Sequence, residues 1–387
     1  MVSKWEMVRL GDVCEIARGG SPRPIEKYIT TEKTGINWIK IGDTSSESMY
    51  ITETREKIIP EGMKKSRYVQ AGDFLLSNSM SFGRPFILKI DGCIHDGWLV
   101  LRDKMNHFQK EYLYYALSSK STYNKFKALA VGGVVNNLNS TIVKQVEFPL
   151  PPLEVQKQIA KTFDVASELI SLRKKQLAEL DNLIKATFYD MFGDPVVNEK
   201  GWGVSKLGEL CKIVRGGSPR PIEKYLGGTV PWIKIGDATN GDNIYLHNTR
   251  ESIIEKGVTK SRYIKTGSMI FANCGVSLGF ARIITFDGCI HDGWLAFNNI
   301  SEKLNRIFLL KQLNEMTLYF RGIAPGGTQP NLNTNIMRKV SVIIPPIDRQ
   351  NQFAEIVTKI EEQKALVQKA IDESQYMFDS LMSQYFE

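Results

Sequence analysis

The chain has 387 residues, of which 42% are hydrophobic and 10% aromatic, so it is too long for one ordinary domain and too apolar for a disordered protein. Its 50 Lys and Arg against 42 Asp and Glu leave a net charge of +8, which favours a polyanionic partner such as nucleic acid. The odd number of cysteines, five, argues against a disulfide framework. The opening MVSKWEMVRLGDV has no apolar core of a secretory signal, and no apolar run approaches the ~18 residues of a membrane span, so we expect a cytoplasmic protein with no membrane partner.

The sequence repeats itself after about half of its length. RGGSPRPIEKY at 18–28 recurs without a change at 215–225, and we call these two segments the basic loops. Four shorter repeats follow in the same order: WIKIGD at 38–43 and 232–237, SRY at 66–68 and 261–263, DGCIHDGWL at 91–99 and 287–295, and NLN at 137–139 and 331–333. This duplication predicts two similar structural units.

Each unit begins with short runs rich in β-branched and aromatic residues, separated by Gly, Pro, Asn and Asp. Such runs predict strands, and in the first unit they are WIKIGD at 38–43, RYVQAGDFLLS at 67–77, RPFILKIDG at 84–92 and VEFPLPP at 146–152. One helix is predicted at 111–129, with its counterpart at 306–323. The globular part is therefore expected to be α+β and built mainly on sheet.

A long helix is predicted after each proline pair, Pro151-Pro152 and Pro345-Pro346. Seam residues recur there at alternating spacings of four and three, which is typical of a coiled coil. The seam of the first helix is Ile159, Phe163, Ala166, Ile170, Arg173, Leu177, Leu180, Ile184, Thr187 and Met191. That of the second is Phe353, Val357, Ile360, Lys364, Val367, Ile371, Ser374, Phe378, Leu381 and Tyr385. The polar members, Arg173, Thr187, Lys364 and Ser374, are candidates for fixing how the helices pair.

These elements predict four consecutive parts. They are a globular domain at 1–150, a helix at 151–194, a second globular domain at 195–344 and a second helix at 345–387. A helix of about 40 residues spans about 60 Å, too long to bury against one small domain, so we expect the two helices to pack on each other as an antiparallel coiled coil between the domains. Two copies of one domain suit a ligand with repeated features, and duplex DNA presents equivalent faces about every 34 Å.

The chain resembles the specificity (S) subunits of type I restriction–modification systems along essentially its whole length. The resemblance rests on the order of the four parts and on local wording: LGDV and LGEL near the starts of the units, GGSPRP, IGD, PLPPLEVQKQIA and IPPIDRQNQFA at the helix starts, and FGDPVVNEKGW at the link. It implies that the globular parts are target-recognition domains reading double-stranded DNA as two half-sites with an unread spacer. In many members the two domains differ, whereas here they are near-copies, so we expect closely related half-sites that approach a palindrome.

The resemblance also implies the partners. Two methyltransferase (M) subunits would bind the starts and exposed flanks of the helices, and restriction (R) subunits would join the full complex. Methylation would fall on adenine N6 and use S-adenosylmethionine bound by the methyltransferase, so no cofactor and no metal is expected in this chain. The resemblance leaves open a homodimer of the isolated chain.

Two other classes of protein stay open beside a non-catalytic DNA-recognition subunit. A coiled-coil scaffold without DNA specificity would explain the helices but not the duplicated basic loops. A self-contained DNA-modifying enzyme would need a nucleotide- or S-adenosylmethionine-binding motif or a carboxylate cluster, and the sequence contains no P-loop and no methyltransferase motif.

The main candidate DNA contacts are basic. Arginine makes bidentate contacts to guanine or phosphate, and glycine lets the backbone approach closely, so the basic loops supply Arg18, Arg23, Lys27, Tyr28, Arg215, Arg220, Lys224 and Tyr225. The segments around the SRY repeats supply phosphate-binding candidates: Lys65, Arg67, Lys260 and Arg262. The alternatives are a structured turn for the loops and a solvated hairpin tip for the SRY segments.

The remaining candidates have weaker support. Asn78 and Asn273 could each contact adenine or cap a turn. His95 and His291 could contact DNA or serve a structural role; each forms a C-x-H pair with a nearby cysteine, and two ligands are too few for a zinc site. Thr328 and Gln329 stand where the first copy has valines, so this segment either distinguishes the half-sites or has drifted neutrally.

Overall fold

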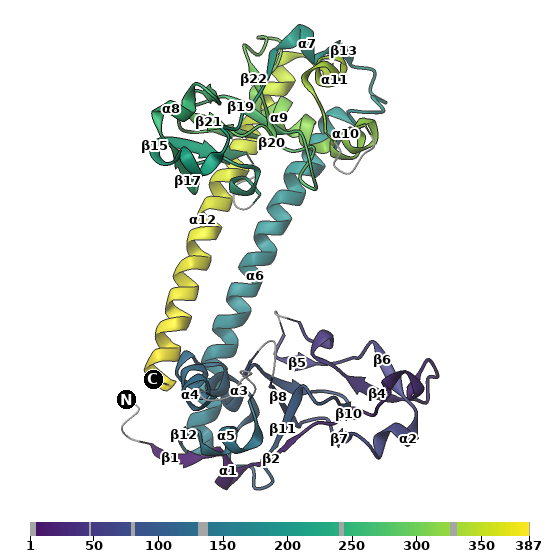
Figure 1. The fold of residues 1–387 in the computed structure, drawn as a ribbon, viewed down its shortest axis with the longest axis vertical. Helices are drawn as coiled ribbons and strands as arrows, with labels where there is room; N and C mark the ends of the chain where they lie inside the picture. The colour runs from purple at the N-terminus through teal and green to yellow at the C-terminus, as the bar shows by residue number, and fades with distance from the viewer. Residues whose placement is uncertain are drawn as a thin grey trace. The chain divides into compact units, whose positions relative to one another are not determined.

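The structure is a computed structural model that describes residues 5–45, 48–78, 82–130, 138–239, 244–325 and 331–386. The chain divides into two compact units, Met1–Lys175 with Gln368–Glu387 and Gln176–Val367. Each unit contains one globular domain and a part of each of the two long helices, α6 (Leu153–Phe192) and α12 (Ile347–Phe386) (Figure 1). We call the globular parts the first domain (β1 to β12) and the second domain (β13 to β23). The predicted α+β class with two similar domains is confirmed.

Three sheets build the first domain. An antiparallel pair joins its two ends, β1 (Glu6–Arg9) and β12 (Glu147–Leu150). One five-stranded sheet has the order β3 (Ile29–Thr30), β6 (Glu56–Ile58), β4 (Ile36–Ile39), β10 (Gly92–Ile94) and β7 (Arg67–Val69). The other has the order β2 (Glu15–Arg18), β11 (Trp98–Arg102), β8 (Phe74–Ser77), β9 (Pro85–Leu88) and β5 (Tyr50–Ile51).

The second domain repeats this plan with one fewer strand among the described residues. Its end pair is β13 (Gly203–Lys206) and β23 (Ser341–Ile344). The four-stranded sheet has the order β17 (Glu251–Ile253), β15 (Leu226–Ile233), β21 (Gly288–Ile290) and β18 (Arg262–Ile264). The five-stranded sheet has the order β14 (Lys212–Arg215), β22 (Trp294–Asn298), β19 (Met269–Ala272), β20 (Ala281–Ile284) and β16 (Tyr245–Leu246). The single strand β15 takes the place of two strands of the first domain, β3 and β4.

Short helices complete each domain, among them α3 packed on β9 and α9 packed on β20. In the first domain they are α1 (Leu10–Val13), α2 (Pro60–Met63), α3 (Lys110–Ser118), α4 (Lys120–Ala130) and α5 (Ser140–Gln145), with 3₁₀ turns η2 (Ile25–Lys27) and η3 (Ile41–Asp43). In the second they are α7 (Leu207–Leu210), α8 (Glu255–Val258), α9 (Arg306–Glu315), α10 (Thr317–Ile323) and α11 (Thr334–Lys339), with η4 (Ile222–Lys224) and η5 (Ile235–Asp237).

The single helix predicted at 111–129 is two helices, α3 and α4, because the chain turns at Ser119. The backbone of Ser119 is extended, with φ −66° and ψ 150°, and its hydroxyl accepts a hydrogen bond from the Thr122 N–H at 3.1 Å. This is the geometry of a helix N-cap, which starts a new helix rather than continuing the old one. The counterpart at 306–323 is likewise divided, at Met316 between α9 and α10.

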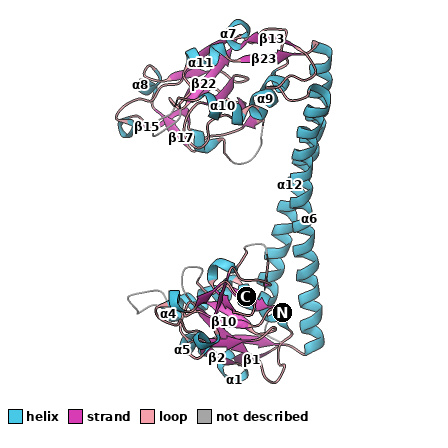
Figure 2. Cartoon of the chain, turned by 90° about the vertical axis from the view of Figure 1, so that its right-hand side faces the viewer, coloured by secondary structure: helices cyan, strands magenta, loops and turns pink. Residues whose placement is uncertain are grey.

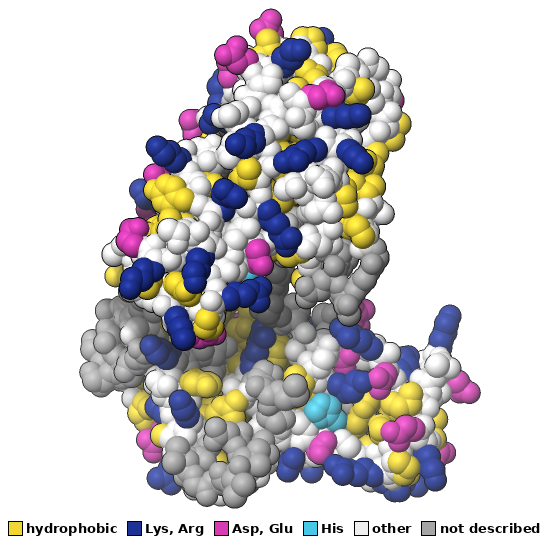
Figure 3. All heavy atoms as spheres, turned by 45° about the horizontal axis from the view of Figure 1, so that its top comes forward, with side chains coloured by type: hydrophobic (Ala, Val, Ile, Leu, Met, Phe, Trp, Pro, Cys, Tyr) yellow, Lys and Arg dark blue, Asp and Glu magenta, His cyan; other side chains and the backbone are white. Residues whose placement is uncertain are grey.

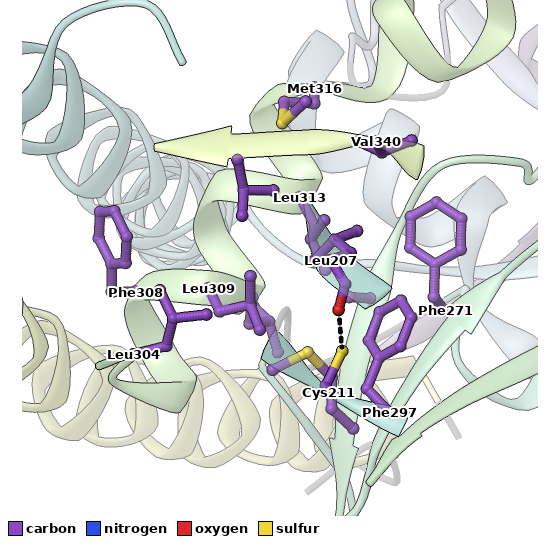
Figure 4. Close-up of a cluster of buried hydrophobic side chains, with 14 of the residues drawn as sticks. Leu207, Cys211, Phe271, Phe297, Leu304, Phe308, Leu309, Leu313, Met316 and Val340 are labelled. Carbon is purple, nitrogen blue, oxygen red and sulfur yellow. Dashed lines mark hydrogen bonds between the residues drawn. The ribbon is translucent and has the colours of Figure 1, made fainter. Parts of the chain in front are cut away.

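An apolar core joins the helices to the sheets in each domain. In the second domain Phe271 of β19 and Phe297 of β22 face α7 and α9 (Figure 4). The Cys211 thiol donates to the carbonyl oxygen of Leu207 at 3.2 Å, and burial raises the pKa of this thiol to about 11. The thiol therefore stays protonated and acts as a small core residue. All five cysteines are free.

The two long helices pack along the predicted seam, as uninterrupted helices beside the strand-rich domains (Figure 2). The start of α6 lies with the end of α12 in one unit and its end with the start of α12 in the other, so the pairing is antiparallel. Every predicted seam residue is buried or half-buried. Polar seam residues pair across the helices: Arg173 donates to the Ala370 carbonyl and the Ser374 hydroxyl, and Lys364 Nζ lies 2.7 Å from Asp181 Oδ1.

Candidate DNA interface

Glycines let the first basic loop pack closely against the segment between β10 and β11 that contains His95. A Cβ on Gly19 would lie 2.1 Å from the carbonyl oxygen of His95, a contact that no side chain can make. The Gly19 N–H donates to the carbonyl oxygen of Trp98 at 2.9 Å, and the Gly20 N–H to that of Ile94 at 3.1 Å. The backbone therefore approaches this segment as closely as glycine allows.

The second basic loop is held in the same way. A Cβ on Gly216 would lie 2.1 Å from the carbonyl oxygen of His291, and the N–H groups of Gly216 and Gly217 donate at 2.9 and 3.1 Å to the carbonyls of Trp294 and Ile290. The RGGSPRPIEKY and DGCIHDGWL repeats are thus the two halves of one packed structure. Their identity in both copies has a structural cause as well as any functional one.

A carboxylate organises each basic loop. Asp96 Oδ1 accepts a hydrogen bond from the Ser21 hydroxyl at 2.6 Å, and Arg18 Nε donates to the Asp96 carbonyl oxygen at 2.9 Å. Arg23 Nη2 lies 3.5 Å from Asp96 Oδ2. The Ser21 hydrogen bond, with Arg18 and His95 nearby, lowers the pKa of Asp96, so the carboxylate is charged at neutral pH. Asp96 therefore holds the first basic loop, and it was not among the residues predicted from the sequence.

The second domain reproduces this arrangement around Asp292. Ser218 donates to Asp292 Oδ1 at 2.7 Å, Arg215 Nε donates to the Asp292 carbonyl at 3.0 Å, and Arg220 lies 3.5 Å from Oδ2. Burial alone would raise the pKa of Asp292, but the Ser218 hydroxyl and the cations around it lower it. The signal that could have identified both carboxylates is their place inside an identical repeat.

The basic candidates around each loop come together in space. Lys65 Nζ lies 2.7 Å from the Tyr28 hydroxyl and 5.2 Å from the centre of its ring, and Arg67 Nε donates to the Arg18 carbonyl at 2.6 Å. The second domain has the same contacts at 2.6, 5.0 and 3.3 Å, in the pairs Lys260 with Tyr225 and Arg262 with Arg215. Each domain therefore carries one compact basic cluster.

The outermost cations of these clusters are open to solvent. The side chains of Arg23 and Arg220 are 82% and 81% exposed. Lys27 and Lys224 are also exposed. Elsewhere on the surface, Figure 3 shows Lys and Arg side chains spread over one face of the molecule with fewer Asp and Glu among them. Cations with this much exposed surface can bind phosphate or a base edge.

The two histidines support the loops. Nδ1 of His95 accepts the Gly97 N–H at 2.6 Å, and Nδ1 of His291 accepts the Gly293 N–H at 2.9 Å. Burial lowers the pKa of both rings, which favours neutral histidines at neutral pH. The described part of the chain contains no group of three His, Cys, Asp or Glu side chains placed to hold a metal ion. Trp98 and Trp294 are core residues with no exposed surface.

Burial contradicts the prediction that Asn78 and Asn273 contact adenine, because their side chains are 2% and 0% exposed. Asn78 Nδ2 donates to the Asp96 carbonyl at 2.8 Å, so this amide supports the loop from inside. The carbonyls of the two residues accept the N–H groups of Leu138 and Leu332, which belong to the NLN repeats. Thr328 and Gln329 lie outside the described residues.

The starts of the long helices are also more enclosed than the sequence suggests. Gln156 and Gln350 are fully buried, and each Nε2 donates to the carbonyl oxygen of a proline before the helix, Pro151 and Pro345, at 2.8 Å. These glutamines fasten the helix to its domain. They leave the exposed flanks of the helices as the surface open to a partner.

Comparison with known proteins gives the family. Residues 2–182 and 199–374 match the type I restriction modification DNA specificity domain, once in each half. The chain belongs to the type I restriction modification DNA specificity family. Two curated relatives from Methanocaldococcus jannaschii are the type I restriction enzyme MjaIX specificity subunit, 26% identical over 98% of this chain and 91% of the relative, and the MjaVIII specificity subunit, 23% identical over 92% and 86%.

Solved structures of type I systems share the fold of this specificity-family chain. A chain from a structural study of complex assembly and conformational transition of the type I R-M system has a TM-score of 0.67 and 18% identity, covering 99% of this chain and 97% of the other. The type I restriction–modification S subunit from M. genitalium has a TM-score of 0.54 and 16% identity, with 99% and 96% covered. None of the helices in the described ranges is both long and apolar enough to cross a bilayer.

Proposed function

We propose that the chain selects the DNA target of a type I restriction–modification complex by reading one half-site with each domain. The observation that carries this proposal is the basic loop: eleven identical residues, held by the same Asp-centred contacts in both domains, with an arginine more than four-fifths exposed at its tip. A structural turn would need the contacts at the base. It would not need the same exposed arginine twice.

The target that fits two such loops is a duplex with two closely related half-sites and an unread spacer between them. Arg18, Arg23, Lys27, Lys65 and Arg67 of the first domain would contact phosphates or base edges, as would their counterparts in the second. Phosphate contacts set the register and affinity, and base contacts set the sequence. The supporting contacts of Asp96 and Asp292 hold each arginine in place before DNA binds.

The chemistry belongs to partners in this proposal. Two methyltransferase subunits would bring S-adenosylmethionine and modify adenine N6, and restriction subunits would join the full complex. Exposed apolar residues on α6 suit a methyltransferase surface: Val165, Leu169 and Leu172, at helical spacing and 58%, 41% and 53% exposed. Leu366 and Met377 offer similar residues on α12.

The test is selection from duplexes with randomised bases, using the full chain with its cognate methyltransferase at two salt concentrations. We expect enrichment of two related half-sites at one fixed spacing. Arg23→Ala and Arg220→Ala should each weaken binding and reduce the salt slope by about one. Lys104→Ala is the control, because this exposed lysine follows the far end of β11 from Asp96.

Sequence-blind binding, or none, would overturn the proposal and favour a scaffold. Turnover of S-adenosylmethionine by the isolated chain would favour a self-contained enzyme.

A further inference from the structure

One pair of side chains beside the basic loops occurs in opposite order in the two domains. The first domain has GRPF at 83–86 and the second has GFAR at 279–282. The strand register shows that these positions are equivalent: the Ser77 N–H donates to the Arg84 carbonyl at 3.0 Å, and the Ala272 N–H to the Phe280 carbonyl at 2.8 Å. Arg84 therefore corresponds to Phe280, and Phe86 corresponds to Arg282.

Both orders build the same stack of three groups. In the first domain the Phe86 ring lies edge-on to Trp98, with centroids 5.8 Å apart, and the Arg84 guanidinium lies 5.0 Å from the Phe86 centroid. In the second, Phe280 lies edge-on to Trp294 at 5.6 Å, and Arg282 lies 4.7 Å from Phe280. Residues two apart on a strand share a face, so either order can satisfy this packing.

What differs is the group presented at the position of Arg84 and Phe280, which we call the outer position. Arg84 is partly exposed, and its Nη2 donates to the Ser45 carbonyl at 3.0 Å. In the second domain the cation is buried. Arg282 is 8% exposed, and its Nη1 donates to the Ala281 carbonyl at 2.8 Å. The outer position there is occupied by the partly exposed ring of Phe280.

The outer position lies at the same end of its sheet as the basic loop, with two strands, β11 and β8, between β2 and β9 in the sheet order. Arg84 is paired with Ser77 at the end of β8, and the next residue, Asn78, donates to the carbonyl of Asp96. Asp96 in turn holds Ser21 and Arg23 of the loop. We therefore expect a duplex bound by the loop to pass this end of the sheet.

We propose that this position makes the two half-sites differ by one base pair, an inference that rests on the proposed function. Arg84 offers a guanidinium, which pairs bidentately with O6 and N7 of guanine. Phe280 offers an apolar ring edge, which suits the methyl group of thymine. The half-site read by the first domain then has guanine where the one read by the second has thymine.

The experiment exchanges the pair within one domain. The double variant R84F/F86R gives the first domain the order of the second while keeping composition, charge and stack. The full chain with its methyltransferase is used to select from duplexes randomised in both half-sites. We expect the preference at one position of the first half-site to change from guanine to thymine, by about tenfold in relative enrichment, with the other half-site unchanged. The mirror variant F280R/R282F should give guanine in the second half-site.

A third variant keeps the proposal testable if an exchange prevents folding. Arg84→Lys retains the charge but lacks the bidentate fork, so it should relax the preference for guanine without abolishing binding. Lys89→Ala, an exposed cation at the other end of β9, is the control and should leave the selected bases unchanged. Variants that fold, bind and select the bases of the unmodified chain would overturn this inference. An unmodified chain that selects no half-sites would overturn the proposed function instead.

Discussion

The two basic loops are identical, whereas the two places where the long helices dock on the domains are not. At the first junction Tyr115 of α3 lies 4.9 Å from Phe163 of α6 and 6.2 Å from Phe378 of α12 between ring centroids, and its hydroxyl donates to Asp164 Oδ1 at 2.8 Å. At this position the junction is aromatic, with the Tyr115 hydroxyl as its polar group.

At the second junction the equivalent position of α9 is Lys311, which is nearly buried. Its Nζ lies 3.9 Å from Glu361 Oε1, and Glu361 Oε2 lies 3.0 Å from Lys364, which also reaches Asp181 at 2.7 Å. Burial lowers the pKa of Lys311, opposed by the charge of Glu361. This ion network lies beside an aromatic cluster of the second junction, in which Phe308 of α9 lies 4.7 Å from Phe192 of α6 and 6.5 Å from Phe353 of α12 between ring centroids.

The basic loops and the helix junctions are therefore under two different kinds of constraint. In the proposed function each loop faces the same kind of ligand, which would account for the identical residues of the two copies. Each junction faces its own helix segments, and a tyrosine in place of Lys311 would remove one cation from the largely buried ion network around Glu361. Different junctions therefore favour one pairing of helices and domains over the alternatives.

The largest expected effect is at the second junction. Glu361→Ala leaves Lys311 and Lys364 without their shared carboxylate and should lower the free energy of unfolding by about 3 kcal/mol. Tyr115→Phe removes only the hydroxyl that donates to Asp164 at the first junction and should cost about 1 kcal/mol. Denaturant unfolding measures both.

Glu362→Ala, at the exposed neighbour on α12, is the control and should change stability by less than about 0.5 kcal/mol. Equal losses for Glu361→Ala and Tyr115→Phe would remove the distinction between the junctions.

The second largest expected effect tests whether the two basic loops contribute equally to DNA binding. Gly19→Ala and Gly216→Ala each place a Cβ 2.1 Å from a backbone oxygen, so each loop must move away from its support. The predicted loss of DNA affinity is about tenfold for each, equal in the two domains, because about one contact of 1–3 kcal/mol is displaced. Titration of a target duplex measures it.

Gly42→Ala is the matched substitution, since a Cβ there meets no atom within 4 Å. Loss of affinity from one loop only would show that the copies contribute unequally, and unchanged affinity in both would remove the loops from the interface.

The smallest effect concerns acid stability, where the two copies should again agree. Burial holds the pKa of His95 and His291 below the ordinary 6.5. The unfolded chain therefore takes up these protons first, and the stability that the neutral rings contribute above pH 6.5 is lost as the pH falls through the folded pKa. The variant H95N/H291N should show a smaller drop in unfolding free energy between pH 7.5 and pH 5.5.

His247→Asn serves for comparison, because His247 lies outside the supports of the basic loops. A double variant with the same pH dependence as the unmodified chain would contradict the role of these two rings.

Features carried by local pattern could be predicted from the sequence. The repeats predicted two similar domains, and the seam spacing predicted α6 and α12. Of the predicted polar seam residues, Arg173, Lys364 and Ser374 pair across the helices, whereas Thr187 bonds to Leu183 of its own helix. The single helix predicted at 111–129 was wrong because one hydroxyl, at Ser119, caps a new helix. Periodicity over a whole segment does not reveal such a local competition.

The candidate site was predicted in part. The basic residues of the loop and of the SRY repeat are brought together, whereas Asn78 and Asn273 are buried. The centre of the site, Asp96, was not among the predicted residues, because its partner Ser21 lies 75 positions away along the chain.

The sequence by itself determined the duplication, the charge of the loops and the helical seam, because repetition, composition and periodicity are properties of residues close along the chain. Only the tertiary structure decided which polar side chains face inward, that Asp96 and Asp292 hold the loops, and that one domain presents Arg84 where the other presents Phe280. Burial and pairing depend on strands that meet from distant parts of the chain. Because the Arg and the Phe lie two residues apart on one strand, they can exchange places while the stack on the tryptophan is kept.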